Sequence, residues 1–233
     1  MKTLVIIPAR NEAASIQEVV ERALQYADAS VTDDGSTDEM PAILKKLLEN
    51  SLRGQYAHRL HVIRHDRSTH IPGAVQDGLR FGVAAGYEWF ITMDAGLSHD
   101  PEAIPDFLKE DPAYDVIIGS RKKVAGVPVY RRAISRLAAL VVNYALSPAW
   151  LRIRRPFIED VTSGFRRYSV RAARIISSSN LTSKAFDFHM EALALTLRQG
   201  CTCKEIPIEY VFTGSSFNMK VLRLGIAFGW SLI

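Results

Sequence analysis

The sequence predicts an α/β protein whose mostly parallel, doubly wound sheet is flanked by helices. Short apolar runs, such as residues 4–7, alternate with longer segments of helical periodicity, such as residues 13–27. The runs are continuously apolar, which is typical of strands that are covered on both faces. Several of them end in an acidic turn containing Gly and Ser. Ligands bind where the strands of such sheets end, so these turns are the first candidates for a site.

The first half of the chain contains four units of strand, loop and helix, as expected for parallel strands. Pro8 ends the first strand, and Ser36 or Thr37 is the expected N-cap of the second helix. The expected strands are 4–7, 29–32, 60–64 and 89–93, and the expected helices are 13–27, 39–50, 74–85 and 102–109.

The sequence pattern of the second half of the chain predicts two more strands and three helices. Pro207 should confine the last strand to an edge of the sheet, because proline has no N–H to donate to a neighbouring strand. The expected strands are 114–118 and 201–212, and the expected helices are 131–151, 170–176 and 186–199.

Charge is distributed unevenly along the chain, although the net charge is only +4. Residues 1–120 hold 11 Lys and Arg against 19 Asp and Glu, whereas residues 121–174 hold 13 against 2. A split of this kind indicates that the second region faces an anionic partner. Phosphate groups of a ligand, anionic lipid and nucleic acid are the candidates. Nucleic acid fits least, because the basic stretch is interleaved with an apolar helix.

The predicted helix at 131–151 has an apolar body with basic ends. Residues 137–151 carry no charge over 15 positions, which is shorter than the about 20 apolar residues that span a bilayer. Such a helix fits a position in the membrane interface, and a core helix or a dimer face explains it equally well. The arginines that flank the body are Arg131, Arg132, Arg136, Arg152, Arg154 and Arg155.

The two cysteines predict reduced thiols. Cys201 and Cys203 would point to opposite faces of a strand, which disfavours a disulfide between them. The sequence has no other Cys and no His near them, which argues against a zinc site. The N-terminal residues lead directly into the first strand, so we expect no secretion signal. Together these features predict a cytoplasmic protein, associated peripherally with the cytoplasmic face of a membrane.

Asp94 is the first candidate for a functional residue. An apolar strand ends at this carboxylate, and Gly96 and Ser98 open the backbone around it. A carboxylate in this place could bind a divalent cation that carries a nucleotide diphosphate. Taken alone, the stretch is explained equally well by an ordinary Asx turn. Arg121 follows the strand at 114–118 and is well placed to contact a phosphate.

Five segments in order resemble the motifs of family 2 glycosyltransferases of GT-A fold, and most closely those of the polyprenol-phosphate (dolichol-phosphate mannosyltransferase-like) branch. The resemblance extends from residue 4 to about residue 217. The segments are V-I-I-P-A-R-N-E at 5–12, V-T-D-D-G-S-T-D at 31–38, M-D-A-G-L-S-H-D-P at 93–101, I-G-S-R at 118–121 and D-V-T-S-G-F-R at 160–166.

The resemblance implies a single GT-A domain over residues 1–233. Residues 1–120 would bind the nucleotide sugar, and residues 121–233 would face the acceptor and the membrane. Asp94 and Ser98 would hold Mg²⁺ or Mn²⁺, and Glu191 would line the acceptor side. The implied donor-binding residues are Pro8, Arg10, Glu12, Thr32, Asp34, Asp94, Ala95, Gly96 and Arg121. The implied catalytic residues are Asp94, Arg121, Asp160 and Arg132.

The implied activity is an inverting transfer of a hexose, mannose from GDP-mannose, to a polyprenol phosphate at the membrane surface. That acceptor is already anionic and needs no strong base. A glycan or another hydroxyl acceptor would need a base, and Asp160 is the candidate. A nucleotide-binding homologue without activity is the third hypothesis. It is suggested by Gly96 in place of a carboxylate and Thr213 in place of a basic residue. Phe217 also replaces a basic residue, and Arg10 replaces an aromatic residue that would stack on the base, which leaves the choice of nucleotide open.

Overall fold

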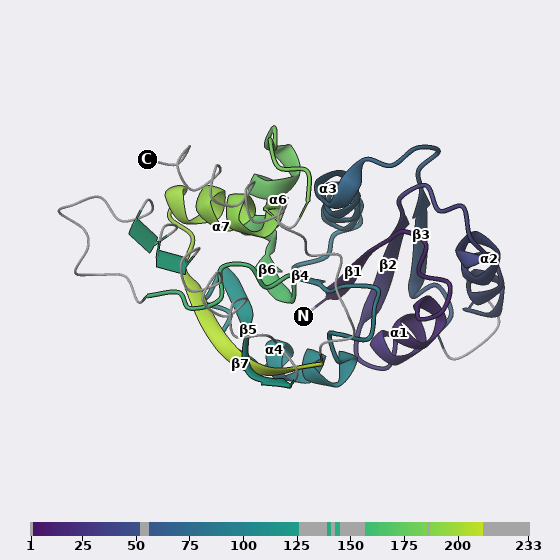
Figure 1. Ribbon diagram of the computed structural model, residues 1–233, viewed down its shortest axis with the longest axis horizontal. Coiled ribbons are helices and arrows are strands. Elements are labelled where there is room, and N and C mark those ends of the chain that lie inside the picture. Colours follow the sequence, from purple (N-terminus) through teal and green to yellow (C-terminus); the bar gives the residue numbers. More distant parts are fainter. Residues whose placement is uncertain are drawn as a thin grey trace.

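The computed structural model describes residues 2–51, 56–125, 139–140, 143–144, 157–185 and 187–211. Within these residues, seven strands form one sheet in the order β3-β2-β1-β4-β6-β5-β7 (Figure 1). The strands are β1 (Thr3–Ala9), β2 (Asp28–Asp33), β3 (Leu60–Arg64), β4 (Trp89–Thr92), β5 (Val116–Ala125), β6 (Arg166–Ser169) and β7 (Cys203–Val211). The helices are α1 (Ile16–Ala23), α2 (Met40–Ser51), α3 (His70–Ala84), the 3₁₀ helix η1 (Pro101–Ala103), α4 (Ile104–Lys109), α6 (Val170–Ser178) and α7 (Phe188–Arg198).

The mostly parallel sheet that the sequence predicted is confirmed. β1 pairs in parallel with β2 and β4, β2 pairs in parallel with β3, and β5 pairs in parallel with β7. β7 lies at the edge of the sheet, as Pro207 predicted. The helix predicted from residue 74 begins at His70, so the loop that follows β3 is shorter than expected.

β6 was not predicted, and it joins the two halves of the sheet. It lies between β4 and β5 and is antiparallel to both. Its residues, R-R-Y-S, lack the apolar pattern of a central strand, yet Arg166 is 0% exposed and Arg167 is 1% exposed. Arg166 donates to the carbonyl oxygens of Val161 and His189, at 2.7 and 2.6 Å. Hydrogen bonds to carbonyl groups allow these guanidinium groups to be buried.

The core lies on both faces of the sheet. Leu4 and Ile6 of β1 pack with the face that α3, α6 and α7 cover, whereas Val5 and Ile7 pack with the face that α1, α2 and α4 cover. Figure 1 shows α3, α6 and α7 along one side of the sheet and α1 and α4 along the other. Because successive side chains of a strand point to opposite faces, a strand covered on both sides must be apolar throughout.

One sequence prediction falls mostly outside the described residues. Of the helix predicted at 131–151, the structure describes only residues 139–140 and 143–144, which are helical. Within the described part of the chain, no helix is both long enough and apolar enough to cross a membrane.

Candidate active site

The loops that follow β1 and β2 hold each other at the carboxyl edge of the sheet. Asn11, in a left-handed conformation with φ 57°, donates its backbone N–H to the Ser36 hydroxyl at 2.9 Å. Its side-chain oxygen accepts from the backbone N–H of Thr37 at 2.8 Å. These bonds bring two of the predicted donor-binding loops together. The predicted donor-binding residues in this region range from exposed (Arg10) through half-buried (Pro8, Glu12) to buried (Thr32, Asp34).

Asp34 holds the loop that leads into α3. Its carboxylate accepts hydrogen bonds from the backbone N–H groups of Thr69 and His70, at 2.6 and 2.9 Å, and from the Ser68 hydroxyl at 2.5 Å. His65 Nδ1 lies 2.8 Å from the same carboxylate. Burial would raise the pKa of Asp34, but these hydrogen bonds outweigh it and hold the pKa below its usual value. In this arrangement Asp34 shapes the loop at 65–70.

His65 connects Asp34 to α3 and was not singled out from the sequence. Its Nδ1 lies 2.8 Å from Asp34 Oδ1, and its Nε2 lies 3.0 Å from Asp77 Oδ2. Both ring nitrogens therefore face carboxylate oxygens at hydrogen-bond distance. The sequence could not show this contact, because it depends on the conformation of the loop between β3 and α3.

Asp94 lies two residues beyond the end of β4, with its side chain 39% exposed. Its backbone N–H donates to Nδ1 of His99 at 3.1 Å. His99 is 1% exposed and stacks on Phe165, with ring centroids 5.1 Å apart. Burial lowers the pKa of His99, which keeps the ring neutral and Nδ1 able to accept. The buried imidazole thus fixes the turn while the Asp94 carboxylate remains open to solvent.

Gly164 lies against Asp94. A β-carbon at this position would come within 3.3 Å of Asp94 Oδ1 and within 2.9 Å of His189 Nε2. The Thr92 hydroxyl donates to the Gly164 carbonyl oxygen at 2.8 Å. The turn at 160–166 is therefore in direct contact with the turn that follows β4. The antiparallel pairing of β6 with β4 produces this contact between residues that are 70 positions apart in the sequence.

Arg121 and Asp160 form a two-point ion pair. Nε and one terminal nitrogen of Arg121 donate to the two Asp160 oxygens, each at 2.7 Å, and the Arg121 backbone N–H adds a bond of 3.1 Å. The same guanidinium donates to the Thr162 hydroxyl at 2.7 Å. Burial would raise the pKa of Asp160, but the hydrogen bonds and charge of Arg121 outweigh it and lower the pKa. The pair is close enough to Asp94 for that carboxylate to help raise the pKa of Arg121.

The pattern of the family "Glycosyl transferase family 2" matches residues 4–173 of the chain. The chain belongs to this family. All the predicted site residues discussed above, from Pro8 to Asp160, lie within the matched region. The protein is therefore a glycosyltransferase, and its fold class and family agree with the prediction from the sequence motifs.

Two relatives of this glycosyltransferase have names that describe sugar transfer to a lipid phosphate. The chain is 29% identical over 218 residues to an undecaprenyl-phosphate mannosyltransferase of Micrococcus luteus, covering 91% of this chain and 84% of the relative. It is 29% identical over 217 residues to a polyprenol monophosphomannose synthase of Mycolicibacterium smegmatis, covering 90% and 77%. The chain is thus similar to these synthases over most of both lengths.

The solved structures that resemble this glycosyltransferase have the GT-A fold. Glucosyl-3-phosphoglycerate synthase from Mycobacterium tuberculosis, solved with Mn²⁺ and UDP-glucose, superposes with a TM-score of 0.70 at 16% identity. The superposition covers 99% of this chain and 78% of the synthase. The complex of the same synthase with UDP gives a TM-score of 0.68 at 15% identity. At these identities the likeness shows the fold alone.

The turn that follows β4 provides few side chains for a metal. Among the described residues, no group of three or more His, Cys, Asp or Glu is arranged to hold a metal ion. Asp94 and Ser98 lie in one turn, with Ala95 buried and Gly96 half-buried between them. No atom lies within 4 Å of the position that a β-carbon at Gly96 would occupy, so the turn is open on that side. The protein can supply one carboxylate and one hydroxyl from this turn.

Glu191, which the motif resemblance placed on the acceptor side, holds the loop at 182–183 in the structure. It is buried, and its carboxylate accepts hydrogen bonds from the backbone N–H groups of Thr182 and Ser183, both at 2.9 Å. Hydrogen bonds of this kind order the loop that precedes α7, and they explain how a carboxylate is tolerated in an apolar helix. Arg132 lies outside the described residues, as do Thr213 and Phe217.

Three residues of the site were passed over in the sequence. His99, Gly164 and His189 all lie next to Asp94 or behind it. His99 and Gly164 stand within quoted motifs, but a motif does not show which of its residues touch each other. His189 is 4% exposed on α7, and burial holds its pKa well below the usual value. The sequence signal that could have identified His189 was a histidine inside an otherwise apolar predicted helix.

Proposed function

We propose that this glycosyltransferase transfers mannose from GDP-mannose to a polyprenol phosphate at a membrane surface, with inversion at the anomeric carbon. The relatives named as undecaprenyl-phosphate mannosyltransferase and polyprenol monophosphomannose synthase support the sugar and the acceptor. The observation that carries the proposal is the placement of an open carboxylate, Asp94, beside the Arg121–Asp160 ion pair at the carboxyl edge of the sheet.

In the proposed reaction an oxygen of the acceptor phosphate forms a bond to the anomeric carbon while the bond to the diphosphate breaks. The nucleoside diphosphate leaves with the electron pair. Arg121 is placed to stabilise the charge that develops on the leaving group, and Asp160 fixes the guanidinium in position through two hydrogen bonds. A divalent cation, held by Asp94 and Ser98 and by the diphosphate itself, would supply further positive charge.

The state of Asp160 favours a phosphate acceptor over a hydroxyl acceptor. A hydroxyl must lose its proton to a base, and the efficiency of a base falls as its pKa falls. Arg121 holds the pKa of Asp160 below the usual value and occupies both of its oxygens. An acceptor phosphate is already anionic and needs no base to remove a proton. The structure thus gives a physical reason to rank the glycan-acceptor hypothesis second.

Exposed apolar side chains support a membrane contact in the region 121–233. Leu140 and Tyr144, four residues apart in a helical segment, are 57% and 56% exposed, and Phe157 is 53% exposed. Asn143 ties the two segments together through bonds of 2.8 and 3.0 Å with the backbone of Ile158. We propose that this region faces the cytoplasmic surface of a membrane and presents the acceptor, while residues 1–120 bind the donor.

The proposal is tested by transfer of radioactivity from labelled GDP-mannose to a polyprenol phosphate in mixed micelles. We expect label in the organic extract when Mg²⁺ or Mn²⁺ is present, and loss of that label in Asp94→Asn. Asp106→Asn is the matched control, because Asp106 is an exposed carboxylate on α4. Label that never enters lipid from GDP-mannose, or that enters a soluble glycan instead, would contradict the proposal.

A further inference from the structure

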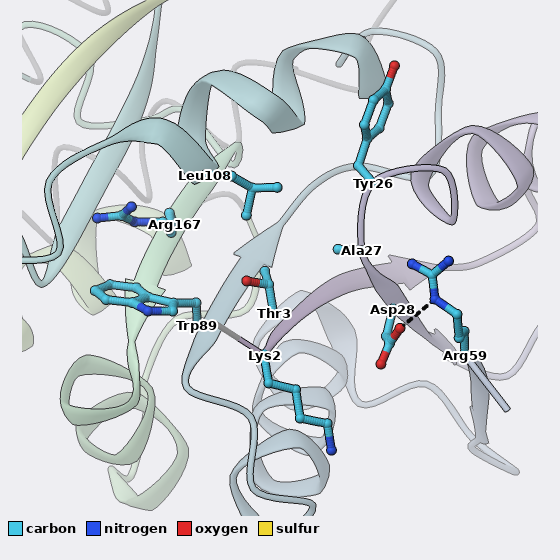
Figure 2. A pocket seen from close by; sticks show the side chains of 9 residues that line it. All are labelled: Lys2, Thr3, Tyr26, Ala27, Asp28, Arg59, Trp89, Leu108 and Arg167. Carbon is cyan, nitrogen blue, oxygen red and sulfur yellow. Dashed lines mark hydrogen bonds and ion pairs between the residues drawn. The ribbon is translucent and has the colours of Figure 1, made fainter.

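A cavity of about 440 Å³ lies where β1, β2 and β4 begin, away from the candidate active site at their carboxyl ends. Figure 2 shows the side chains that line it. Its lining includes Thr3, Asp28 and Trp89, which are the first residues of β1, β2 and β4. Because these strands are parallel, their first residues meet at the edge where the strands begin. Asp94 follows the end of β4, so the cavity and the glycosyltransferase site are separated by the length of the strands.

Two buried polar groups of the lining have no hydrogen-bond partner among the described residues. They are the hydroxyl of Thr3, which is 7% exposed, and Nε of Arg167, which is 1% exposed. Figure 2 shows the Thr3 hydroxyl directed toward the side of the cavity formed by Trp89 and Arg167. Buried polar groups are almost always satisfied by protein, water or a ligand. Two such groups beside one cavity leave hydrogen-bonding capacity that the described residues do not use.

The charge of the lining favours an anion. Lys2, Arg59 and Arg167 are its cations, and Asp28 is its one carboxylate. Arg59 Nε already pairs with Asp28 at 2.7 Å, and the Tyr87 hydroxyl donates to the other Asp28 oxygen at 2.8 Å. The negative charge of Asp28 is therefore compensated by neighbours on its own side of the cavity.

Arg167 is a cation whose buried guanidinium is held by carbonyl oxygens. Its terminal nitrogens donate to the carbonyl oxygens of Phe107, Glu110 and Asp111, at 2.9, 2.8 and 2.9 Å. Burial lowers the pKa of Arg167, which means that its positive charge is poorly solvated. The guanidinium lies over the Trp89 ring, 4.2 Å from its centroid. An anion in the cavity would stabilise this charge, and the ring offers an apolar surface beside it.

We propose that this cavity binds a small organic anion. A carboxylate or phosphate group accepts hydrogen bonds from Arg167 Nε and the Thr3 hydroxyl, and an apolar body lies against Trp89 and Leu108. The site is independent of the proposed glycosyltransferase reaction, because it shares no residue with the carboxyl edge of the sheet. It offers the enzyme a second ligand, bound where β1, β2 and β4 begin.

The test uses ¹⁹F NMR of three probes with the full chain: 4-fluorobenzoate, 4-fluorophenyl phosphate and the neutral 4-fluorobenzamide. We expect broadening or a shift for at least one anion at millimolar concentration, and none for the amide. Thr3→Val removes the hydroxyl with little change in shape, and should weaken binding of the anion about tenfold. Ser30→Ala is the matched control, because Ser30 also has a buried hydroxyl without a partner but does not line the cavity.

The outcomes separate this site from the nucleotide site. Binding that persists with excess GDP and in Asp94→Asn, and weakens in Thr3→Val and Arg59→Gln, supports the proposal. The anion that binds then identifies the head group as carboxylate or phosphate. Displacement of the probe by GDP would place it in the active site and overturn the proposal. Absence of binding by both anions, equal binding of the amide, or equal affinity in Thr3→Val would overturn it as well.

Discussion

Gly164 and Asp94 are in contact across the junction of β4 and β6, so closely that a β-carbon at Gly164 would lie 3.3 Å from Asp94 Oδ1. The contact couples the turn at 160–166, which holds the Arg121–Asp160 pair, to the carboxylate at the end of β4. The position of Asp94 therefore depends on the backbone of a segment that is distant in the sequence. The absence of a side chain at residue 164 is a requirement of the site.

Gly164→Ala should lower kcat by about 100-fold, because a shift of about 1 Å in a catalytic group can have an effect of this size. The added methyl group must displace His189 or Asp94, whose atoms would lie 2.9 and 3.3 Å away. Gly82→Ala is the control, since its β-carbon would meet Phe90 at 2.6 Å in the core, far from the site. It should reduce stability and leave kcat of the folded enzyme near the wild-type value. Equal kcat in the two variants would contradict the role of Gly164.

Gly96→Asp should tighten the binding of Mn²⁺ by about tenfold or more, because affinity for such cations rises with the number of charged oxygen ligands. The position has room, with no atom within 4 Å of the new β-carbon, and its φ is not positive. Calorimetry with Mn²⁺ and GDP measures the effect. Gly96→Asn, which is similar in shape but neutral, should show a much smaller gain. An unchanged Mn²⁺ affinity in Gly96→Asp would show that the cation does not bind at this turn.

The ends of the parallel strands could be predicted because they depend on local sequence. An apolar run followed by an acidic turn with Gly and Ser located Asp94 and the Asp33–Asp34 pair at one edge of the sheet. β6 could not be predicted in the same way. Its two arginines are buried only because carbonyl oxygens from α4, α7 and the nearby loops accept their hydrogen bonds, and no local pattern shows those partners.

The orientation of the site residues could not be predicted from the motifs. Arg121 and Asp160 are 39 residues apart, and they meet because β6 inserts between β4 and β5. Asp34 has the motif position expected for a nucleotide contact, yet its carboxylate is occupied by the loop at 65–70. A motif gives the residue type and its place along a strand. The partners that decide its charge and direction come from the tertiary fold.

Asp160→Asn should lower the free energy of unfolding by about 3 kcal/mol at pH 7, because it leaves the mostly buried Arg121 cation without its anionic partner. The pKa of Asp160 is lowered in the folded state, so its contribution is present above the unfolded pKa of about 3.9. It is lost as the pH falls through the folded pKa. Urea unfolding of both proteins across this range should show a difference that is constant near neutral pH and shrinks below about pH 4. A difference that grows on acidification would contradict the ion pair.

Asp34→Asn should loosen the loop at 65–70 and raise KM for the donor more than it changes kcat. The carboxylate holds the backbone N–H groups of Thr69 and His70, and its replacement should cost about 2 kcal/mol of stability through weaker hydrogen bonds. Faster hydrogen exchange confined to residues 65–70 measures the loosening. Asp77→Asn is the matched control, because it changes the far contact of His65 and the ion pair with Arg80 on α3 but touches neither Thr69 nor His70, and it should leave the loop amides protected. If Asp34→Asn leaves exchange unchanged and lowers kcat alone, then Asp34 acts directly on the reacting groups and the loop does not depend on it.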